Sequence, residues 1–212
     1  MAEIFTPVNL KFLFNGLKLT MLIAGSSMLL SLIFGTILAI ARNYGRGLIA
    51  AVATIYIELF RSTPNLLWIL AIRFLVPIEP MYSGILSFTL FTSAVVAEIL
   101  RGGFNAVGKG QFEAAYSQGF TFLQTLWYII MPQCFKYSVP ALLSQIITVV
   151  KDTAFLWTVS IEEFTGKGMI LMGSFGTTAQ VFTLFGFMAL IYFVINFMLS
   201  IIVRGLQKKS LA

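Results

Sequence analysis

The stretch "LTMLIAGSSMLLSLIFGTILAIA", from Leu19 to Ala41, contains no Asp, Glu, Lys or Arg. A second uncharged run of the same length extends from Val181 to Val203. Because about 20 consecutive apolar residues cross a bilayer as a helix, each run is long enough to span a membrane. Together the two runs predict an all-α integral membrane protein that crosses the bilayer several times.

The composition supports this class. Of the 212 residues, 58% are hydrophobic and only 10% are charged, whereas about a quarter of the residues in a soluble domain are charged. The first apolar run is longer than the roughly 7–15-residue core of a cleaved signal peptide, and "RNYGRG" follows it in place of a small-residue cleavage site. We therefore expect the first run to remain as a span.

Cysteine and histidine usage excludes several kinds of site. Cys134 is the single cysteine and there is no histidine, so the chain offers no disulfide framework, no Cys or His metal site and no His-dependent nucleophile. The net charge is +6. The basic residues do not form the continuous basic surface of a nucleic-acid-binding protein, because they lie at the ends of the apolar runs. That distribution is typical of a membrane protein.

The pattern predicts one membrane domain, residues 1–212, with five spans. The positive-inside tendency favours an outer N-terminus and an inner C-terminus. The expected spans are 16–41, 48–76, 82–100, 132–152 and 179–204, with a cytoplasmic hairpin at about 101–131. The inner segments then hold Arg42, Arg46, Arg101, Lys109, Arg204, Lys208 and Lys209 against Glu113, and the outer ones hold Glu3, Glu79, Glu162 and Glu163 beside Lys11 and Lys167.

Two of the expected spans are interrupted. Glu58 and Arg61 lie three positions apart, so on a helix they share a face and could pair. Pro64 disfavours helical geometry at the residue before it. The fourth span ends in "KDT" at Lys151–Thr153, and the apolar run that follows, to Ile161, is too short to cross. Broken helices with internal charge are a common way to build a transport path.

Each interruption also has a simpler interpretation. Glu58 and Arg61 could form a structural ion pair that holds the second span against a neighbour. Lys151 and Asp152 could form an interfacial turn, with the lysine reaching the outer surface. Charge inside a membrane is costly and is usually functional, so both interpretations stay open beside the transport path.

The hairpin after the third span is polar and rich in glycine. Gly102, Gly103, Gly108 and Gly110 predict a poor continuous helix there. From Gln111 the pattern becomes helical, with Glu113 near the favourable N-terminal end and Gly119 placed to end the helix. A largely apolar run to Pro132 follows. This segment could transmit the movement of a soluble partner, or it could be an interfacial helix that lies on lipid.

The spacing in this hairpin resembles the EAA loop of ABC importer permeases. Glu-Ala-Ala at 113–115 is followed by Gly119 and then by Ile129-x-Met131-Pro132, where the family has leucine at the position of Met131. The chain resembles the polar amino acid (HisMQ-like) permeases of that superfamily over roughly residues 10–207. The blocks that carry the resemblance are "ELFRSTPNLL" (58–67), "AEILRGGFNAVGKGQFEAA" (97–115), "IIMPQCFKYSVPALLSQII" (129–147) and "KDTAFLWTVSIEEF" (151–164).

The resemblance implies a type I ABC importer permease fold in a bacterial cell membrane, with no enzymatic activity and no cofactor of its own. The chain lacks a "GxxxxGK[ST]" loop, so ATP–Mg would bind in a partner. The implied partners are a second permease (identical or paralogous), two cytoplasmic ABC ATPase subunits and an extracytoplasmic solute-binding protein. The implied ATPase-coupling residues are Gln111, Glu113, Ala114, Ala115, Tyr116, Gly119 and Pro132.

An amino acid zwitterion needs both a cationic and an anionic contact along its path. Arg61 and Lys151 are the candidates for its carboxylate, and the acidic candidates include Glu98, which could instead orient Arg101. The full set of path candidates is Glu58, Arg61, Thr92, Ser93, Glu98, Gln145, Lys151, Asp152, Thr153 and Trp157.

The resemblance is closest to glutamate, aspartate or glutamine permeases, with arginine and histidine uptake as other branches. An ion-coupled secondary carrier is the alternative function. Such carriers usually show internal repeats, and none is evident here. A Ser–Lys intramembrane hydrolase is a further candidate, but no nucleophile in the sequence has an evident base partner.

Overall fold

The computed structural model describes residues 4–211, and the side chains of residues 4–206. Glu3 and the side chains of Lys208 and Lys209, which entered the orientation argument, lie outside these described parts. The chain is helical almost throughout. Within the described residues, four helical stretches are long and apolar enough to cross a membrane: Pro7–Tyr44, Pro80–Ala106, Phe122–Val159 and Thr178–Leu206.

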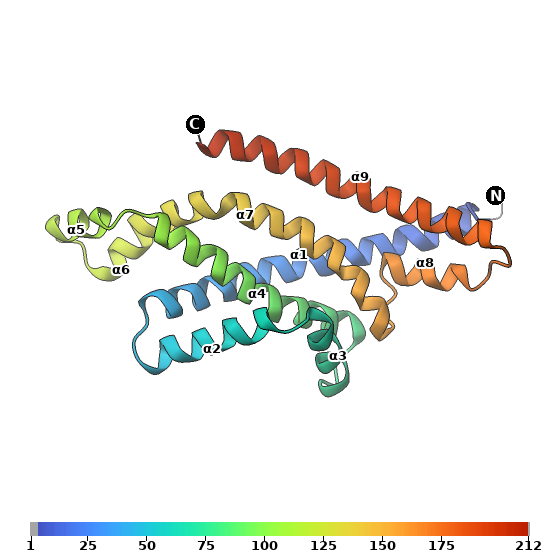
Figure 1. The fold of residues 1–212 in the computed structure, drawn as a ribbon, viewed down its shortest axis with the longest axis horizontal. Coiled ribbons are helices and arrows are strands. Elements are labelled where there is room, and N and C mark those ends of the chain that lie inside the picture. The colour runs from blue at the N-terminus through green and yellow to red at the C-terminus, as the bar shows by residue number, and fades with distance from the viewer. Residues whose placement is uncertain (1–3, 212) are drawn as a thin grey trace.

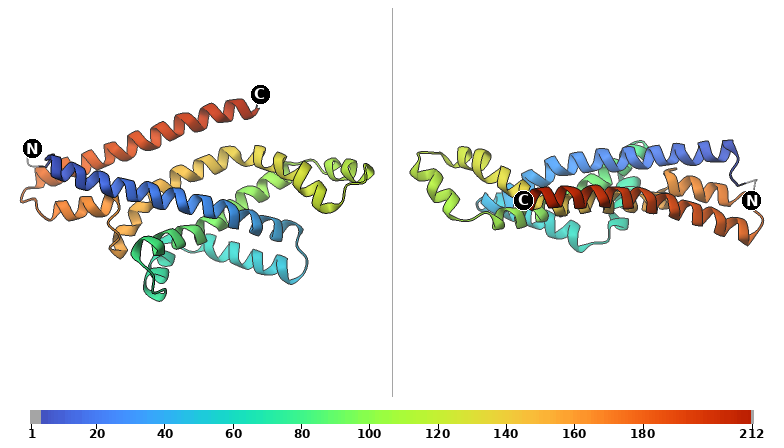
Figure 2. Two further views of the ribbon diagram at one scale, coloured as in Figure 1. Left: turned by 180° about the vertical axis from the view of Figure 1, so that it is seen from behind. Right: turned by 90° about the horizontal axis from the view of Figure 1, so that it is seen from above.

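The long helices form an elongated bundle (Figures 1 and 2). Helix α1 (Pro7–Tyr44) packs along α4 (Pro80–Ala106), and α4 also packs against α7 (Met131–Asp152). The short helices α5 (Gly110–Ser117) and α6 (Phe122–Thr125) lie together at one end of the bundle. At the opposite end, α8 (Phe164–Met172) leads into α9 (Thr178–Leu211), which runs back along the outside of the bundle.

Hydroxyl groups join α1 to α4. Ser27 donates to the carbonyl oxygen of Ile85 at 3.3 Å, and Ser31 donates to that of Thr89 at 3.2 Å. In a bilayer no water satisfies such groups, so hydrogen bonds between helices and close packing of small residues take the place of a hydrophobic driving force. The α1–α4 pair therefore forms the packed centre of the bundle.

The expected second span, 48–76, is two helices. α2 (Leu48–Ser62) ends at an extended Thr63, and α3 (Asn65–Leu75) begins after Pro64. The predicted break is confirmed, because proline removes a backbone donor and restricts the residue before it. Each piece is shorter than the about 20 residues that a single crossing requires.

The predicted break in this glycine-rich segment is confirmed at 107–109, between α4 and α5. It is wrong at Gly102 and Gly103, because α4 continues through both to Ala106. At Gly103 the backbone of α4 lies directly on α7. A Cβ there would stand 2.7 Å from the carbonyl oxygen of Cys134 and would also clash with the hydroxyl of Ser138. The close contact with α7 requires glycine, and this packing outweighs the unfavourable helix propensity.

We expect Gly103→Ala to lower the free energy of unfolding by about 1–3 kcal/mol, because the added methyl group forces α4 and α7 apart. Gly102→Ala is the matched control. Nothing lies within 4 Å of a Cβ built there, so the stability should be unchanged or slightly increased. Thermal unfolding in mild detergent compares the two variants, and equal midpoints would contradict the close approach.

Candidate coupling helix and transport path

Helix α5 is closed by Gly119 in a left-handed conformation, with φ +85°. The N–H of Phe120 donates to the carbonyl oxygen of Ala115 at 3.1 Å, and the N–H of Gly119 donates to that of Tyr116 at 3.0 Å. This pair of bonds is a Schellman closure, which needs a residue that takes left-handed geometry at low cost. The predicted helix end at Gly119 is confirmed.

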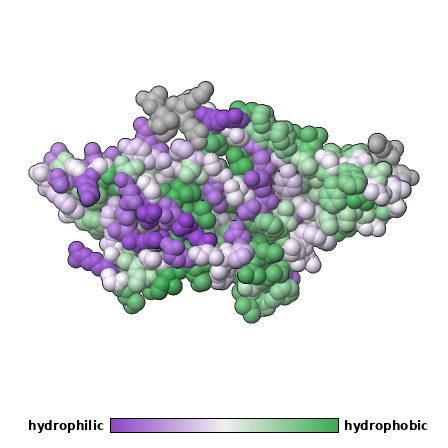
Figure 3. All heavy atoms as spheres, in the orientation of Figure 1, coloured by the Kyte–Doolittle hydropathy of each residue, from purple (hydrophilic) through white to green (hydrophobic). Residues whose placement is uncertain are grey.

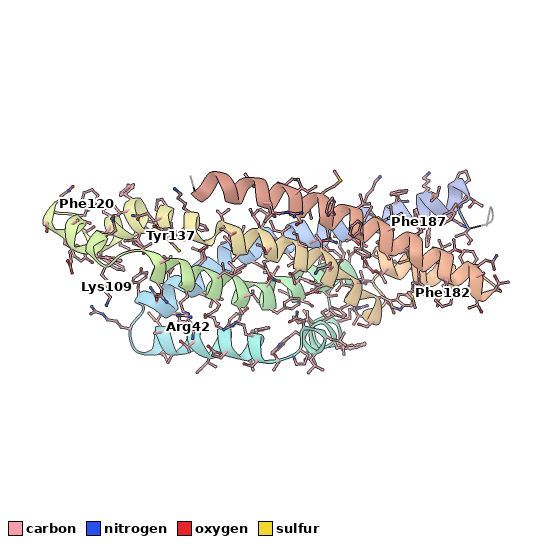
Figure 4. The ribbon with its side chains drawn as sticks, turned by 45° about the horizontal axis from the view of Figure 1, so that its top comes forward. Arg42, Lys109, Phe120, Tyr137, Phe182 and Phe187 are labelled. Carbon is pink, nitrogen blue, oxygen red and sulfur yellow. The ribbon has the colours of Figure 1, made fainter. Side chains whose placement is uncertain are left out.

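Most of the predicted coupling residues lie on the open surface of this hairpin. Ala115 is the exception, because it is only 3% exposed and packs into the hairpin. In Figure 4, Phe120 and Lys109 mark the hairpin at the far end of the bundle. The exposed members of the predicted set are Gln111, Glu113, Ala114, Tyr116, Gly119 and Pro132.

Contacts between aromatic rings join the hairpin to the long helices. The ring of Tyr44, at the end of α1, lies 5.3 Å from that of Phe104 in α4, 5.9 Å from that of Phe112 in α5 and 5.6 Å from that of Phe122 in α6. Such edge and tilted contacts add to the energy of burial. A π-helical turn, η1 (Leu126–Ile130), then joins α6 directly to α7. The exposed helix is thus connected mechanically to α1, α4 and α7.

Five charged side chains form an ionic cluster where α1, α2 and α4 meet, centred on Glu98. The Glu98 carboxylate lies 3.1 Å from Arg42, 3.7 Å from Arg61 and 2.6 Å from Arg101. Glu58 pairs with Arg42 at 2.8 Å. Figure 3 shows hydrophilic spheres gathered on this side of the bundle, and Figure 4 labels Arg42 there. We call this group the Glu98 cluster.

The contacts of the Glu98 cluster contradict the expected Glu58–Arg61 pair and confirm the expected Glu98–Arg101 contact. Glu58 and Arg61 do not pair with each other, because each reaches a residue of another helix instead. Glu98 does orient Arg101, as the second interpretation of Glu98 held. Arg42 also belongs to the cluster. From the sequence, Arg42 was counted only among the basic residues that set the orientation in the membrane. Its partner Glu98 lies 56 positions away, so no local pattern could have paired the two.

We expect Glu98→Gln to destabilise the fold by about 1–3 kcal/mol, because three arginines lose their shared counter-ion. Glu58→Gln is the control, since the Glu58 side chain is 50% exposed and has one ionic partner among the described residues. An exposed pair of that kind contributes about 0–1 kcal/mol. Thermal unfolding at low and high salt measures both effects, and a Glu58→Gln loss as large as that of Glu98→Gln would contradict the central place of Glu98.

Several of the predicted path residues lie inside helix contacts. Thr92 and Ser93 are buried in α4, and the Ser93 hydroxyl lies 3.1 Å from that of Tyr56. Thr153 is buried at the start of the 3₁₀ segment η2 (Thr153–Val159), where its hydroxyl donates to the carbonyl oxygen of Val150. Thr92 and Thr153 line none of the grooves described here, and Ser93 lines only the apolar groove beside Leu38 and Tyr56. Gln145, Asp152 and Trp157 are partly exposed.

Lys151 faces a groove between α7 and α9. The groove has a volume of about 490 Å³ and is lined on α9 by Tyr192, Asn196 and neighbouring apolar residues. These α9 residues belong to the middle of the uncharged run from Val181 to Val203, so the lysine meets an apolar part of α9. Within the described residues Lys151 makes no ion pair. Lys151 is exposed where α7 ends and η2 begins, so the interfacial turn and the transport path both stay predictions.

The face of α7 that ends at Lys151 is polar and open. Its members recur at helical spacing and are exposed or, for Thr148, partly exposed: Tyr137, Ala141, Ser144, Thr148 and Lys151. Ser144 and Thr148 each turn a hydroxyl back to the carbonyl oxygen four residues earlier. Figure 4 labels Tyr137 on this helix. We call this face the α7 polar stripe. The charge of Lys151 at the end of this stripe suits water or protein better than lipid.

Comparison with known proteins decides the family. The family model described as "Binding-protein-dependent transport system inner membrane component" matches residues 12–211. The chain belongs to this family. The permease is 33% identical over 97% of its length, and 97% of the relative, to the "Probable glutamine ABC transporter permease protein GlnP" of Bacillus subtilis (strain 168). It is 29% identical over 95% of both chains to the "Glutamate/aspartate import permease protein GltK" of Escherichia coli O6:H1.

Solved structures agree with this family. The permease superposes on a chain from the crystal structure of an amino acid ABC transporter with histidines, with a TM-score of 0.83, 29% identity and 94% coverage of each chain. It shares the fold of a chain from an inward-facing MetNI methionine ABC transporter, with a TM-score of 0.77, 16% identity and coverage of 95% and 99%. The predicted resemblance to polar amino acid ABC permeases is thereby confirmed.

Family membership settles the general role. The permease is a multi-pass protein of the bacterial inner membrane. It is a non-catalytic subunit without a cofactor of its own, and it works in an ABC transporter complex with ATPase subunits. The ion-coupled carrier and the intramembrane hydrolase are set aside.

Glu163 is a feature of the permease that sequence reasoning missed, because it was counted as an outer-segment acid. The side chain is fully buried. It accepts hydrogen bonds from the Thr20 hydroxyl at 3.0 Å, the Tyr192 hydroxyl at 3.2 Å and the Gly166 N–H at 2.8 Å. Burial raises the pKa of the carboxyl, and these donors oppose the rise. Glu163 therefore ties α1, α8 and α9 together at the end opposite α5.

Proposed function

We propose that the permease forms the translocation path of an ATP-driven amino acid importer. We propose glutamine, glutamate or aspartate as the substrate, because relatives at about 30% identity carry these names. The α7 polar stripe, ending at Lys151, which has no ion pair among the described side chains, is the observation that carries the proposal of a path. A lysine without an ionic partner in an apolar groove is costly unless an anionic group reaches it.

The proposed topology has an outer N-terminus, an inner C-terminus and five crossings, with α2 and α3 together making the second. The basic side chains at the α5 end favour this orientation over its reverse. The whole of 1–212 then acts as one membrane domain with a cytoplasmic hairpin at about 101–131. The proposed complex has a second permease, identical or paralogous, two ATPase subunits and an external solute-binding protein.

For coupling, we propose that the exposed face of α5 docks on an ATPase subunit. Glu113, Ala114 and Gly119 form an open surface with little side-chain bulk, on which a protein cleft can close. Because aromatic contacts and η1 tie α5 to α1, α4 and α7, a displacement of α5 moves those helices. ATP binding and hydrolysis then alternate the membrane halves between outward-open and inward-open states.

For the substrate, we propose that Lys151 contacts the carboxylate and Asp152 the ammonium group. Glu58, Arg61 and Glu98 are less suited, because each already takes part in an ion pair of the Glu98 cluster. Gln145 and Trp157 complete the polar wall. The permease needs contacts that differ between its two states rather than tight binding, since an importer must also release its cargo.

The test is uptake by the complete complex in liposomes, with labelled glutamine, glutamate, aspartate, arginine and histidine offered separately. ATP on the ATPase side and the binding protein on the other should both be required. Uptake should survive an uncoupler that collapses ion gradients. Uptake that continues without ATP and stops with the uncoupler would overturn the proposal.

A further inference from the structure

An apolar groove follows the α1–α2 hairpin. One part, of about 390 Å³, is lined by residues that include Leu38, Ile49, Val52 and Tyr56. A second part, of about 230 Å³, shares Leu38 and Tyr56 and continues along α1 and α4 past Phe34. The groove therefore runs from the hairpin towards the middle of the bundle, between helices that lie side by side in Figures 1 and 2.

The groove offers no free polar group to an occupant along its length. The hydroxyl of Tyr56 donates to the carbonyl oxygen of Leu90 at 2.8 Å and lies 3.1 Å from that of Ser93. The hydroxyl of Thr89 donates to the carbonyl oxygen of Ile85. An occupant therefore gains only by burying hydrocarbon, at roughly 25 cal/mol per Å² of apolar surface removed from water. A lipid acyl chain has that chemistry.

The hairpin end of the groove is basic. Arg46 lies in the turn between α1 and α2, is exposed and has no ion pair or hydrogen bond within the described residues. Arg42, on the same hairpin, is neutralised by Glu58 and Glu98. The first turn of α2 contains no acidic residue and has no side-chain cap. A guanidinium pairs with phosphate through two parallel hydrogen bonds.

We propose that the α1–α2 hairpin binds one anionic phospholipid of the inner leaflet, with its phosphate on Arg46 and an acyl chain in the groove. The charge complementarity is direct, because the inner leaflet is the anionic one and each nearby Lys or Arg contributes about 1 kcal/mol of attraction. The proposal rests on the N-out, C-in orientation of the proposed function. It concerns a lipid site on the outer wall of the permease, separate from the α7 polar stripe.

The experiment measures lipid retention rather than transport, so a failure here is distinct from a failure of the proposed function. The permease is purified with its ATPase subunits, stripped of lipid, and titrated with phosphatidylglycerol while native mass spectrometry counts the bound molecules. We expect one retained phosphatidylglycerol per permease chain. Arg46→Gln should weaken it about fivefold, the factor that corresponds to about 1 kcal/mol.

Two controls separate the headgroup contact from the groove. Arg204→Gln removes an exposed arginine on α9 and should leave retention unchanged. Val52→Trp, at a position that lines the groove and is 56% exposed, should fill the groove and abolish retention with Arg46 intact. Phosphatidylcholine should bind Arg46→Gln and the wild type alike.

Three results would overturn the proposal. The first is equal retention of phosphatidylglycerol by the wild type and Arg46→Gln. The second is retention that is just as strong for phosphatidylcholine, because the groove would then hold any hydrocarbon. The third is loss of the second permease from the complex in Val52→Trp, because the groove would then be a contact between two permease chains.

Discussion

Replacing Gly119 by aspartate should uncouple the importer. Gly119 holds φ +85° at the end of α5, a conformation that costs a residue with a side chain about 1–2 kcal/mol. The new carboxylate also stands at the negative end of the helix dipole, which is unfavourable. We expect ATP-dependent uptake to fall by about tenfold or more, the factor that about 1.4 kcal/mol represents, with the permease still inserted in the membrane.

The measurement is co-purification of the ATPase subunits, followed by ATP hydrolysis with and without the binding protein. Gly108→Asp is the matched control, because it places the same charge in the same exposed hairpin at a position with ordinary backbone geometry. Gly119→Asn should keep part of the activity, since asparagine tolerates the left-handed region. If ATP hydrolysis and uptake stayed fully coupled in Gly119→Asp, the proposal that α5 contacts the ATPase would be wrong.

Replacing Lys151 by glutamine should produce the second large effect. If its ammonium group holds the substrate carboxylate, its loss removes a charged hydrogen bond that contributes about 1.5–3 kcal/mol. We therefore expect the efficiency of uptake to fall by about 10–100-fold. The ATPase activity that the binding protein stimulates should persist, because Lys151 lies outside the α5 hairpin.

Arg61→Gln is the comparison, because Arg61 was the other candidate for the carboxylate and is engaged by Glu98 at 3.7 Å. We expect a modest loss of stability and near-normal apparent affinity. Lys151→Arg should restore part of the uptake, since the charge is kept. Normal rate and apparent affinity in Lys151→Gln would exclude Lys151 from the path.

The parts of the fold that the sequence could predict depend on local physics. An uncharged run has to be a helix in a bilayer, because only a helix satisfies its own backbone there. The break before Pro64 follows from a missing donor and a steric clash. The end of α5 follows from the freedom of Gly119 to take positive φ. Each of these depends on residues within a few positions of one another.

The candidate site was only partly predictable, because residues on other helices determine the ion-pair partner of each charged side chain. Glu58 and Arg61 have the right spacing to pair, and both instead turn to other helices. Lys151 and Arg61 look equivalent as cations in the sequence. In the fold Arg61 lies 3.7 Å from the Glu98 carboxylate, and Lys151 has no ion pair within the described region. The difference between them is one of tertiary contact.

By itself, the sequence determined the membrane class, the break before Pro64 and the end of α5 at Gly119, since covalent geometry and the bilayer act on short segments. Only the tertiary structure decided that Gly103 belongs inside a helix, that Arg42 meets Glu98, and that Glu163 is buried among α1, α8 and α9. These contacts join residues up to 143 positions apart. The physical reason is that in lipid a polar group must find its partner within the protein, and packing determines which distant group that partner is.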